Sequence, residues 1–360
     1  MADYRDVPML VYWEVTRACA LACRHCRAKA VPFRDPRELT TAEGEALLEV
    51  LADSPEPQPH VVLTGGDPLQ RPDLLHLVSY ARQLGLRVSV TPSGTPSLTT
   101  KALTALRDSG VTSLAFSLDG ATAEQHDLLR GVRGSFQATV AAILWSVTHE
   151  VPVQVNTLVA AETRNALEDV GRLVRYFRVS RWALFFLVRT GRGEQLHELK
   201  PEEAEETLEW LYRYARQMPK PVVKTTEAHH YRRIEVEHTL RATPRQGLES
   251  SQRGAWGVRD GAGIVFISHT GDVYPSGFLP VTVGNVRKQD VLRLYREAPL
   301  LRALRDPNML KGKCRRCEYR AICGGSRARA FAATGDPLEA DPLCPYQPRQ
   351  TAAEAAAVFA

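Results

Sequence analysis

The chain has 360 residues, of which 44% are hydrophobic and 24% are charged, and its 46 basic and 41 acidic residues leave a net charge of +5. These values are ordinary for a soluble globular protein, and no apolar run approaches the roughly 18 residues that span a bilayer. The acidic N-terminus lacks the layout of a signal peptide, so we expect a cytoplasmic protein, not a membrane span, a secreted disulfide scaffold or a disordered chain. The mild basic excess fits an anionic substrate or an acidic electron donor, and without a clustered patch it does not indicate nucleic-acid binding.

Apolar runs alternate with helical patterns along the first half of the chain. Strands are predicted at residues 9–15, 61–64, 86–91, 113–118, 151–159 and 182–188, and helices at residues 71–84, 101–109, 135–149 and 165–179. Repeated β/α units indicate an α/β fold with a parallel sheet, and about six units favour a partial (β/α)6 TIM-like barrel over an open sheet. In such barrels the chemistry gathers at the C-terminal ends of the strands.

Seven cysteines lie in two groups near the ends of the chain: Cys19, Cys23 and Cys26, then Cys314, Cys317, Cys323 and Cys344. An odd count without an export signal argues against disulfides, so the short spacings favour metal ligation by thiolates. A [4Fe–4S] cluster normally takes four thiolates, so the first group would leave one iron open to another ligand. The alternative for that group is a structural zinc loop completed by His25.

The Cys19-x3-Cys23-x2-Cys26 motif after an early strand resembles the cluster-binding motif of the radical S-adenosylmethionine (SAM) enzymes. The resemblance implies that these three cysteines hold a [4Fe–4S] cluster and that SAM binds at its open iron. It further implies that one electron, supplied by a flavodoxin- or ferredoxin-type reductant, cleaves SAM to a 5′-deoxyadenosyl radical that abstracts hydrogen from the substrate.

The segment after the second predicted strand, Gly65-Gly66-Asp67-Pro68, resembles the family's Gly-Gly-Glu-Pro motif, whose backbone binds the SAM amino group. Aspartate stands here in place of glutamate. The alternative is a plain β-turn, since Gly-Gly and Asp-Pro both form turns.

Five further residues resemble SAM-binding positions of the family: Ser93, Ser117, Asp119, Arg130 and Asn156. The resemblance implies that the two serines and the aspartate lie near the SAM ribose and carboxylate. It implies that Arg130 pairs with the SAM carboxylate, as a bidentate donor would, although an arginine at a helix end can instead cap carbonyls. Asn156 would bond the ribose or the adenine, or else be a satisfied amide at a strand end.

The character of the chain changes after about residue 194. A charged helix is predicted at residues 194–218, and His229-His230-Tyr231-Arg232-Arg233 follows it. A histidine pair with two arginines is a candidate site for an anionic substrate, even a metalloporphyrin; the alternative is a solvated polar helix start. Arg189, Arg192 and Arg327 are further candidate partners for substrate carboxylates.

The order Cys314-x2-Cys317-x5-Cys323, followed by Cys344, resembles the core of the SPASM/Twitch extensions of radical SAM enzymes. Ser276 and Ser326 stand where further cysteines are usual. Four ligands suit one auxiliary [4Fe–4S] cluster, although a closed shell of four cysteines is also a normal zinc site. The resemblance implies a barrel at residues 8–195, a helical connecting region at 196–255 and a SPASM/Twitch-like domain at 256–350.

Residues 13–28, 268–279, 323–330 and 334–336 resemble the branch of the family that contains the alternative heme synthase. This implies oxidative decarboxylation of two propionates of iron-coproporphyrin III to vinyl groups, with an auxiliary cluster that could accept the released electron. A peptide-modifying maturase remains an alternative. Only 18 residues precede Cys19, too few for a fused leader-binding domain, but a separate leader-binding protein would evade that objection. A non-catalytic zinc-binding protein is the other alternative.

Overall fold

Seven parallel strands follow one another in space as they do along the chain, in the part that the computed structural model describes, residues 4–242 and 258–349. They are β1 (Leu10–Thr16), β2 (His60–Gly65), β3 (Arg87–Val90), β4 (Ser113–Ser117), β5 (Val153–Val159), β6 (Arg181–Phe186) and β7 (Val222–Thr226). Each pairs in parallel with the next. The predicted α/β fold with a partial barrel is therefore confirmed.

The seventh strand lies where the sequence predicted a helical connection. The segment 222–226 has only five residues with a lysine at its centre, so it lacks the apolar pattern of a buried strand. The predicted connecting region (196–255) and extension (256–350) include residues 243–257 and 350, which lie outside the described residues.

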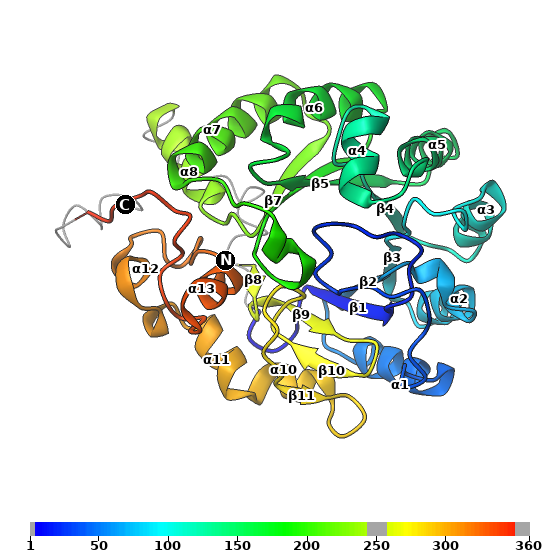
Figure 1. Cartoon of the computed structure of the whole chain (residues 1–360). Helices are drawn as coiled ribbons and strands as arrows, with labels where there is room; N and C mark the ends of the chain where they lie inside the picture. The colour runs from blue at the N-terminus through cyan, green and yellow to red at the C-terminus, as the bar shows by residue number, and fades with distance from the viewer. Residues whose placement is uncertain (1–3, 243–257, 350–360) are drawn as a thin grey trace.

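Helices surround the strands on the outside (Figure 1). They are α1 (Thr41–Ala52), α2 (Leu74–Gln83), α3 (Thr100–Asp108), α4 (Ala123–Arg130), α5 (Ser135–Thr148), α6 (Leu167–Tyr176), α7 (Pro201–Gln217) and α8 (Tyr231–Ala242), with short 3-10 turns η1 (Pro68–Gln70), η2 (Arg164–Ala166), η3 (Gly191–Gln195) and η4 (Pro307–Met309). Helix α1 was not predicted, yet it begins with a capping box of Thr40 and Glu43. Trp13 and Trp182 are fully buried in the core. None of the described helices is long and apolar enough to cross a membrane.

The C-terminal extension continues the same sheet beyond β1. It contains β8 (Arg259–Asp260), β9 (Gly263–Ile267), β10 (Asp272–Tyr274), β11 (Gly284–Asn285), α10 (Val291–Glu297), α11 (Pro299–Arg305), α12 (Gly312–Arg316) and α13 (Arg327–Thr334). Strand β9 pairs in parallel with β1, and β10 and β11 follow in antiparallel order. In Figure 1 the extension, coloured yellow to red, lies on the β1 side of the barrel.

Candidate active site

A cavity of about 600 Å³ occupies the inside of the barrel. Alternate strand residues face it, and many of them are small or polar: Ser89, Ser113, Ala115, Asn156 and Ala183. Closed barrels usually fill this space with bulky branched side chains. The small inner residues here leave a hollow whose size is typical of small-molecule and cofactor sites.

The loop between β1 and α1, which carries the first three cysteines, rests on the end of α4. The N–H of Ala22 donates to the carbonyl of Arg130 (3.1 Å), and the N–H of Arg24 donates to the carbonyl of Leu129 (2.9 Å). Carbonyls in the last turn of a helix have no partner within the helix. The cysteine loop thus satisfies them and is held in place in return.

Arg192, in η3, fixes the other side of the cysteine loop. Its Nε donates to the carbonyl of Cys23 (2.8 Å), and its guanidinium also donates to the carbonyl of Ala30 (3.1 Å). Its backbone N–H donates to the carbonyl of Cys26 (3.0 Å). An arginine that the sequence offered as a substrate contact therefore binds the backbone of the cysteine loop.

The thiols of this loop line the cavity and receive N–H donors. The N–H of Leu21 donates to Sγ of Cys19 (3.3 Å), and the N–H of Ala30 donates to Sγ of Cys26 (3.4 Å). Burial raises the pKa of the Cys19 thiol to about 11, so an ionised sulfur at this position needs a bound cation. Hydrogen bonds to sulfur are a feature of iron–sulfur sites, and the donor set fits a cluster.

Gly65 and Gly66 bring the end of β2 against the backbone of the cysteine loop. A Cβ on Gly66 would lie 2.5 Å from the carbonyl oxygen of Ala18 and 2.6 Å from that of Arg17. The Gly66 N–H donates to the carbonyl of Thr16 (2.9 Å). Both glycines line the cavity, so this close approach presents bare backbone to a ligand.

Asp67 is buried and fixes the neighbouring strand end. Its carboxylate accepts hydrogen bonds from the Thr95 hydroxyl (2.7 Å), the Ser93 N–H (3.3 Å) and the Leu69 N–H (3.2 Å). Pro68 begins η1. The cavity wall formed by described residues includes Gly65 and Gly66 but neither Asp67 nor Pro68, so Asp67 acts on the site through the loop that it holds.

Asp119 and Arg130 form a buried ion pair where β4 and α4 end. The other carboxylate oxygen of Asp119 accepts from the N–H of Leu158 (2.7 Å), and Arg130 also donates to Sγ of Cys23 (3.7 Å). Burial opposes ionisation of Asp119. The charge of Arg130, together with smaller contributions from His25, His126 and the Leu158 N–H, outweighs burial and holds the pKa of this carboxyl below its usual value. The sequence assigned the two residues to separate SAM contacts, whereas the structure pairs them with each other on the cavity wall.

Three more of the predicted SAM-binding residues also line the cavity: Ser93, Ser117 and Asn156. The Ser93 hydroxyl donates to the carbonyl of Gly66 (2.9 Å). The amide oxygen of Asn156 accepts from Gln154 (2.7 Å). The ends of consecutive strands thus converge around one space, as the barrel geometry predicts.

Three of the predicted substrate residues, Arg192, His229 and Arg232, line the cavity. His229 is buried, and neither of its ring nitrogens has a hydrogen-bond partner among the described residues. The Arg232 guanidinium donates to the carbonyls of Ile322 (3.0 Å) and Val258 (2.7 Å). It ties α8 to the segment that precedes Cys323.

Four other predicted substrate residues stand outside the wall that the described residues form: Arg189, His230, Arg233 and Arg327. Arg233 pairs with the carboxylates of Glu205 and Glu237. Arg327 is fully buried and donates to the carbonyls of Pro337 (3.0 Å) and Glu339 (2.6 Å). The guanidinium groups of Arg233 and Arg327 therefore bind other groups of the protein.

Arg181 and Lys224 face the cavity from β6 and β7, and the sequence did not single them out. Burial, with a contribution from the Arg181 guanidinium, lowers the pKa of Lys224 to about 8. A period-two pattern could have found both cations. Arg181 and Ala183 lie on the same face of β6, and Lys224 of β7 is the register partner of Ala183. The signal was missed because residues 222–226 were not recognised as a strand.

The second cysteine group lies beside α12 and α13, and its four thiols line one small pocket. The Gly325 N–H donates to Sγ of Cys323 (3.4 Å), and the Asp341 N–H donates to Sγ of Cys314 (3.5 Å). Burial raises the pKa of the Cys317, Cys323 and Cys344 thiols to about 12. The structure therefore brings together the four thiols that the sequence grouped.

The two serines at expected cysteine positions have other roles. Ser326 caps α13, because its hydroxyl accepts from the Arg329 N–H (2.9 Å) and donates to the Glu227 carboxylate. Ser276 lines the large cavity. Ser326 thus links the segment after Cys323 to the end of β7.

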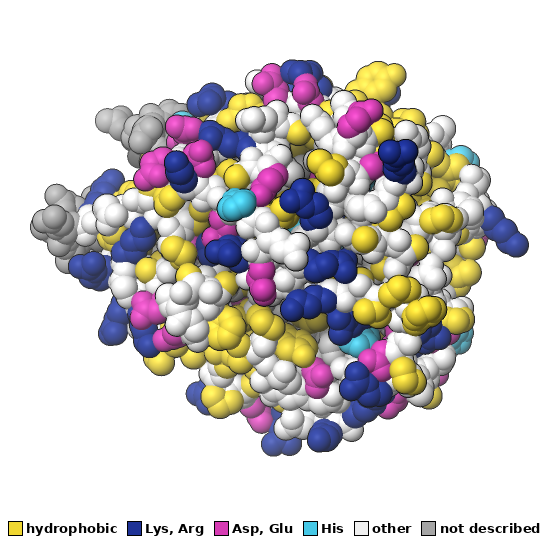
Figure 2. Space-filling view, in the orientation of Figure 1, with side chains coloured by type: hydrophobic (Ala, Val, Ile, Leu, Met, Phe, Trp, Pro, Cys, Tyr) yellow, Lys and Arg dark blue, Asp and Glu magenta, His cyan; other side chains and the backbone are white. Residues whose placement is uncertain are grey.

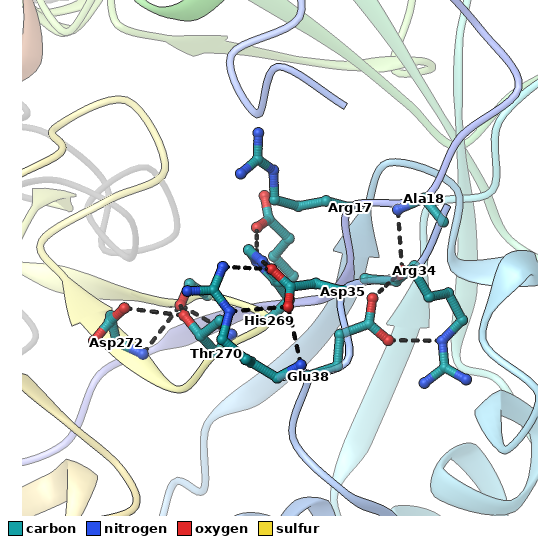
Figure 3. Close-up of polar contacts among 12 residues, drawn as sticks. Arg17, Ala18, Arg34, Asp35, Glu38, His269, Thr270 and Asp272 are labelled. Atoms are coloured by element: carbon teal, nitrogen blue, oxygen red, sulfur yellow. Dashed lines mark hydrogen bonds and ion pairs between the residues drawn. The ribbon is translucent and has the colours of Figure 1, made fainter. Parts of the chain in front are cut away.

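A network of hydrogen bonds and ion pairs connects the extension to β1 and to the cysteine loop (Figure 3). Nδ1 of His269 forms a hydrogen bond with the carboxylate of Glu14 in β1 (2.9 Å). Glu14 also forms an ion pair with Arg27 (3.2 Å). The Thr16 hydroxyl donates to Glu38, which Arg34 also binds (2.7 Å). The extension and the loop therefore hold the same end of β1.

Comparisons with known proteins show which sequences this chain is similar to. Residues 13–174 match the family model described as the radical SAM superfamily. The chain is 38% identical over 353 residues to the AdoMet-dependent heme synthase of Methanosarcina barkeri (strain Fusaro / DSM 804), a match that covers 97% of this chain and 99% of the relative. It is 40% identical over 348 residues to the AdoMet-dependent heme synthase of Oleidesulfovibrio alaskensis, covering 95% of this chain and 88% of the relative.

The fold also matches solved structures. The crystal structure of Streptococcus suis SuiB bound to S-adenosylmethionine superposes with a TM-score of 0.73 at 16% sequence identity, covering 95% of this chain and 78% of SuiB. At this identity the likeness shows the fold alone.

Proposed function

The chain belongs to the radical SAM superfamily, and we propose that it decarboxylates propionate side chains of iron-coproporphyrin III to vinyl groups in heme biosynthesis. It is a radical SAM enzyme with an α/β barrel and a cysteine-rich C-terminal extension. The observation that carries the substrate assignment is the 38–40% identity, over nearly the whole chain, to proteins called AdoMet-dependent heme synthase.

Cys19, Cys23 and Cys26 would hold the [4Fe–4S] cluster, with SAM at its open iron. When bound, these groups supply a 5′-deoxyadenosyl radical that removes a hydrogen atom from the substrate. The glycine backbone of residues 65–66 would receive the SAM amino group. Arg130 already forms an ion pair with Asp119. It would bind the SAM carboxylate only through guanidinium N–H groups that do not bond Asp119.

The inner wall of the barrel suits a polycarboxylate. Arg181, Lys224 and Arg232 line one cavity, and desolvation strengthens the attraction between such groups and a carboxylate. Lys and Arg side chains, in dark blue, also lie across the middle of the face shown in Figure 2. Propionates of a porphyrin would find cationic partners in Arg181 and Lys224. The guanidinium groups of Arg232, Arg233 and Arg327 already bind other groups of the protein.

Cys314, Cys317, Cys323 and Cys344 would hold one auxiliary [4Fe–4S] cluster, which would supply a one-electron acceptor. A closed shell of four cysteines is also a normal zinc site. The match to the radical SAM superfamily supports an iron–sulfur cluster over zinc at the first cysteine group.

Anaerobically reconstituted protein, incubated with iron-coproporphyrin III, SAM and dithionite, tests the proposal. Dithionite replaces the flavodoxin- or ferredoxin-type protein that would act as reductant. Mass spectrometry should detect one and then a second conversion of propionate to vinyl, with formation of 5′-deoxyadenosine. SAM cleavage without change in the porphyrin would contradict the substrate and favour a peptide-modifying activity.

A further inference from the structure

One buried imidazole in the cavity wall has no partner. His229 is 5% exposed and lines the cavity, and neither Nδ1 nor Nε2 has a hydrogen-bond partner among the described residues. A buried polar group without a hydrogen-bond partner costs free energy. This cost is recovered if a ligand in the cavity bonds one of the nitrogens.

The groups beside His229 are two carboxyls from different parts of the chain. One oxygen each of Glu227 and Asp260 lies within 4.8 Å of a His229 nitrogen, and all three residues are buried. Asp260 accepts from the N–H groups of Arg327 (3.1 Å) and Ala328 (3.0 Å). A carboxylate behind a metal-bound histidine commonly takes the second ring N–H and orients the imidazole.

A free divalent cation suits this position poorly. The guanidinium groups of Arg232, Arg259 and Arg327 surround His229 and, after burial, are the main causes that keep its pKa well below the usual value. The imidazole is therefore neutral, with a lone pair available, but the same positive charges repel a dication. Iron within a porphyrin avoids this repulsion, because the macrocycle contributes two negative charges and its propionates contribute more.

We propose that His229 is the axial ligand to the iron of the porphyrin substrate. Neutral imidazole is a common ligand of heme iron. His229 follows β7 and the cysteine loop follows β1, and both border the same cavity. Iron ligation would therefore hold the macrocycle in the cavity that also receives SAM. This inference rests on the proposed substrate.

The test compares wild-type protein with His229→Ala and His230→Ala. His230 is a matched control, since it is equally buried and its ring nitrogens also lack partners among the described residues, yet it is not part of the cavity wall. Each protein is titrated anaerobically with iron-coproporphyrin III and with metal-free coproporphyrin III, and binding is followed by absorption spectroscopy.

We expect wild type and His230→Ala to show the spectrum of an imidazole-ligated iron porphyrin. His229→Ala should lose that signature and bind the iron porphyrin about tenfold or more weakly, with the signature restored by added imidazole. Affinity for the metal-free porphyrin should be the same in all three proteins. An unchanged spectrum in His229→Ala would overturn the ligand assignment, whereas failure of wild type to bind either porphyrin would overturn the proposed substrate itself.

Discussion

Replacing Arg192 by alanine should release the cysteine loop without unfolding the barrel. The wild-type guanidinium donates to the carbonyls of Cys23 and Ala30, and these two bonds exist only while the loop keeps its shape. The backbone N–H of residue 192 would still reach the carbonyl of Cys26. The substitution therefore removes the side-chain bonds and keeps the main-chain bond.

The magnitude follows from the two lost bonds. A hydrogen bond from a charged donor contributes about 1.5–3 kcal/mol, and Arg192 is only partly buried, so we take about 2–4 kcal/mol for the pair. Since about 1.4 kcal/mol corresponds to a factor of ten, loop opening should become about 30- to 700-fold more populated. The cluster held by this loop should then lose iron faster by a similar factor.

Iron release to a chelator from anaerobically reconstituted protein measures this effect. About half of the iron should leave quickly from Arg192→Ala, while the iron held by the second cysteine group should leave at the wild-type rate. Arg189→Ala is the control, because Arg189 is exposed, lies on the same segment and stands outside the cavity wall of the described residues. Equal release rates for Arg192→Ala and Arg189→Ala would refute the reasoning.

Three further predictions concern other parts of the site. Gly66→Ala would place a Cβ 2.5 Å from the carbonyl oxygen of Ala18, so the backbone must shift; we expect SAM affinity to fall about tenfold or more with an unchanged circular dichroism spectrum, and wild-type affinity would contradict the close approach. Burial lowers the pKa of Lys224 to about 8, and a bound carboxylate would raise this pKa. The attraction between the Lys224 ammonium and a substrate carboxylate is therefore present below about pH 8 and is lost progressively above it. Binding of iron-coproporphyrin III should weaken as pH rises through that value, and Lys224→Met should bind more weakly at pH 7 and lose this pH dependence; the same slope in both proteins would exclude Lys224 as the partner. Cys317→Ser should lower reconstituted iron from about eight to about four per chain while SAM cleavage persists, and an undiminished iron content would remove Cys317 from the ligands.

The cysteine groups and the β/α alternation could be predicted from the sequence because both are local patterns. Ligand spacing within the loop of Cys19 to Cys26 depends on a few consecutive residues, and strand and helix periods repeat along the chain. The glycines at residues 65–66 were likewise visible as a strand end. These features predicted a barrel whose first loop carries three cysteines, together with an extension rich in thiols.

The tertiary structure decided which side chains share the cavity and which are already paired. Arg192 and Arg327 looked like substrate contacts in the sequence, but both guanidinium groups bind backbone carbonyls. Arg192 binds those of the cysteine loop, which is distant along the chain, and Arg327 binds those of Pro337 and Glu339 in the segment after α13. Arg181 and Lys224 face the cavity because adjacent strands place alternate residues on one side. The partners of a long cationic side chain depend on contacts that only folding brings together, so the same residue type binds a ligand in one place and the protein itself in another.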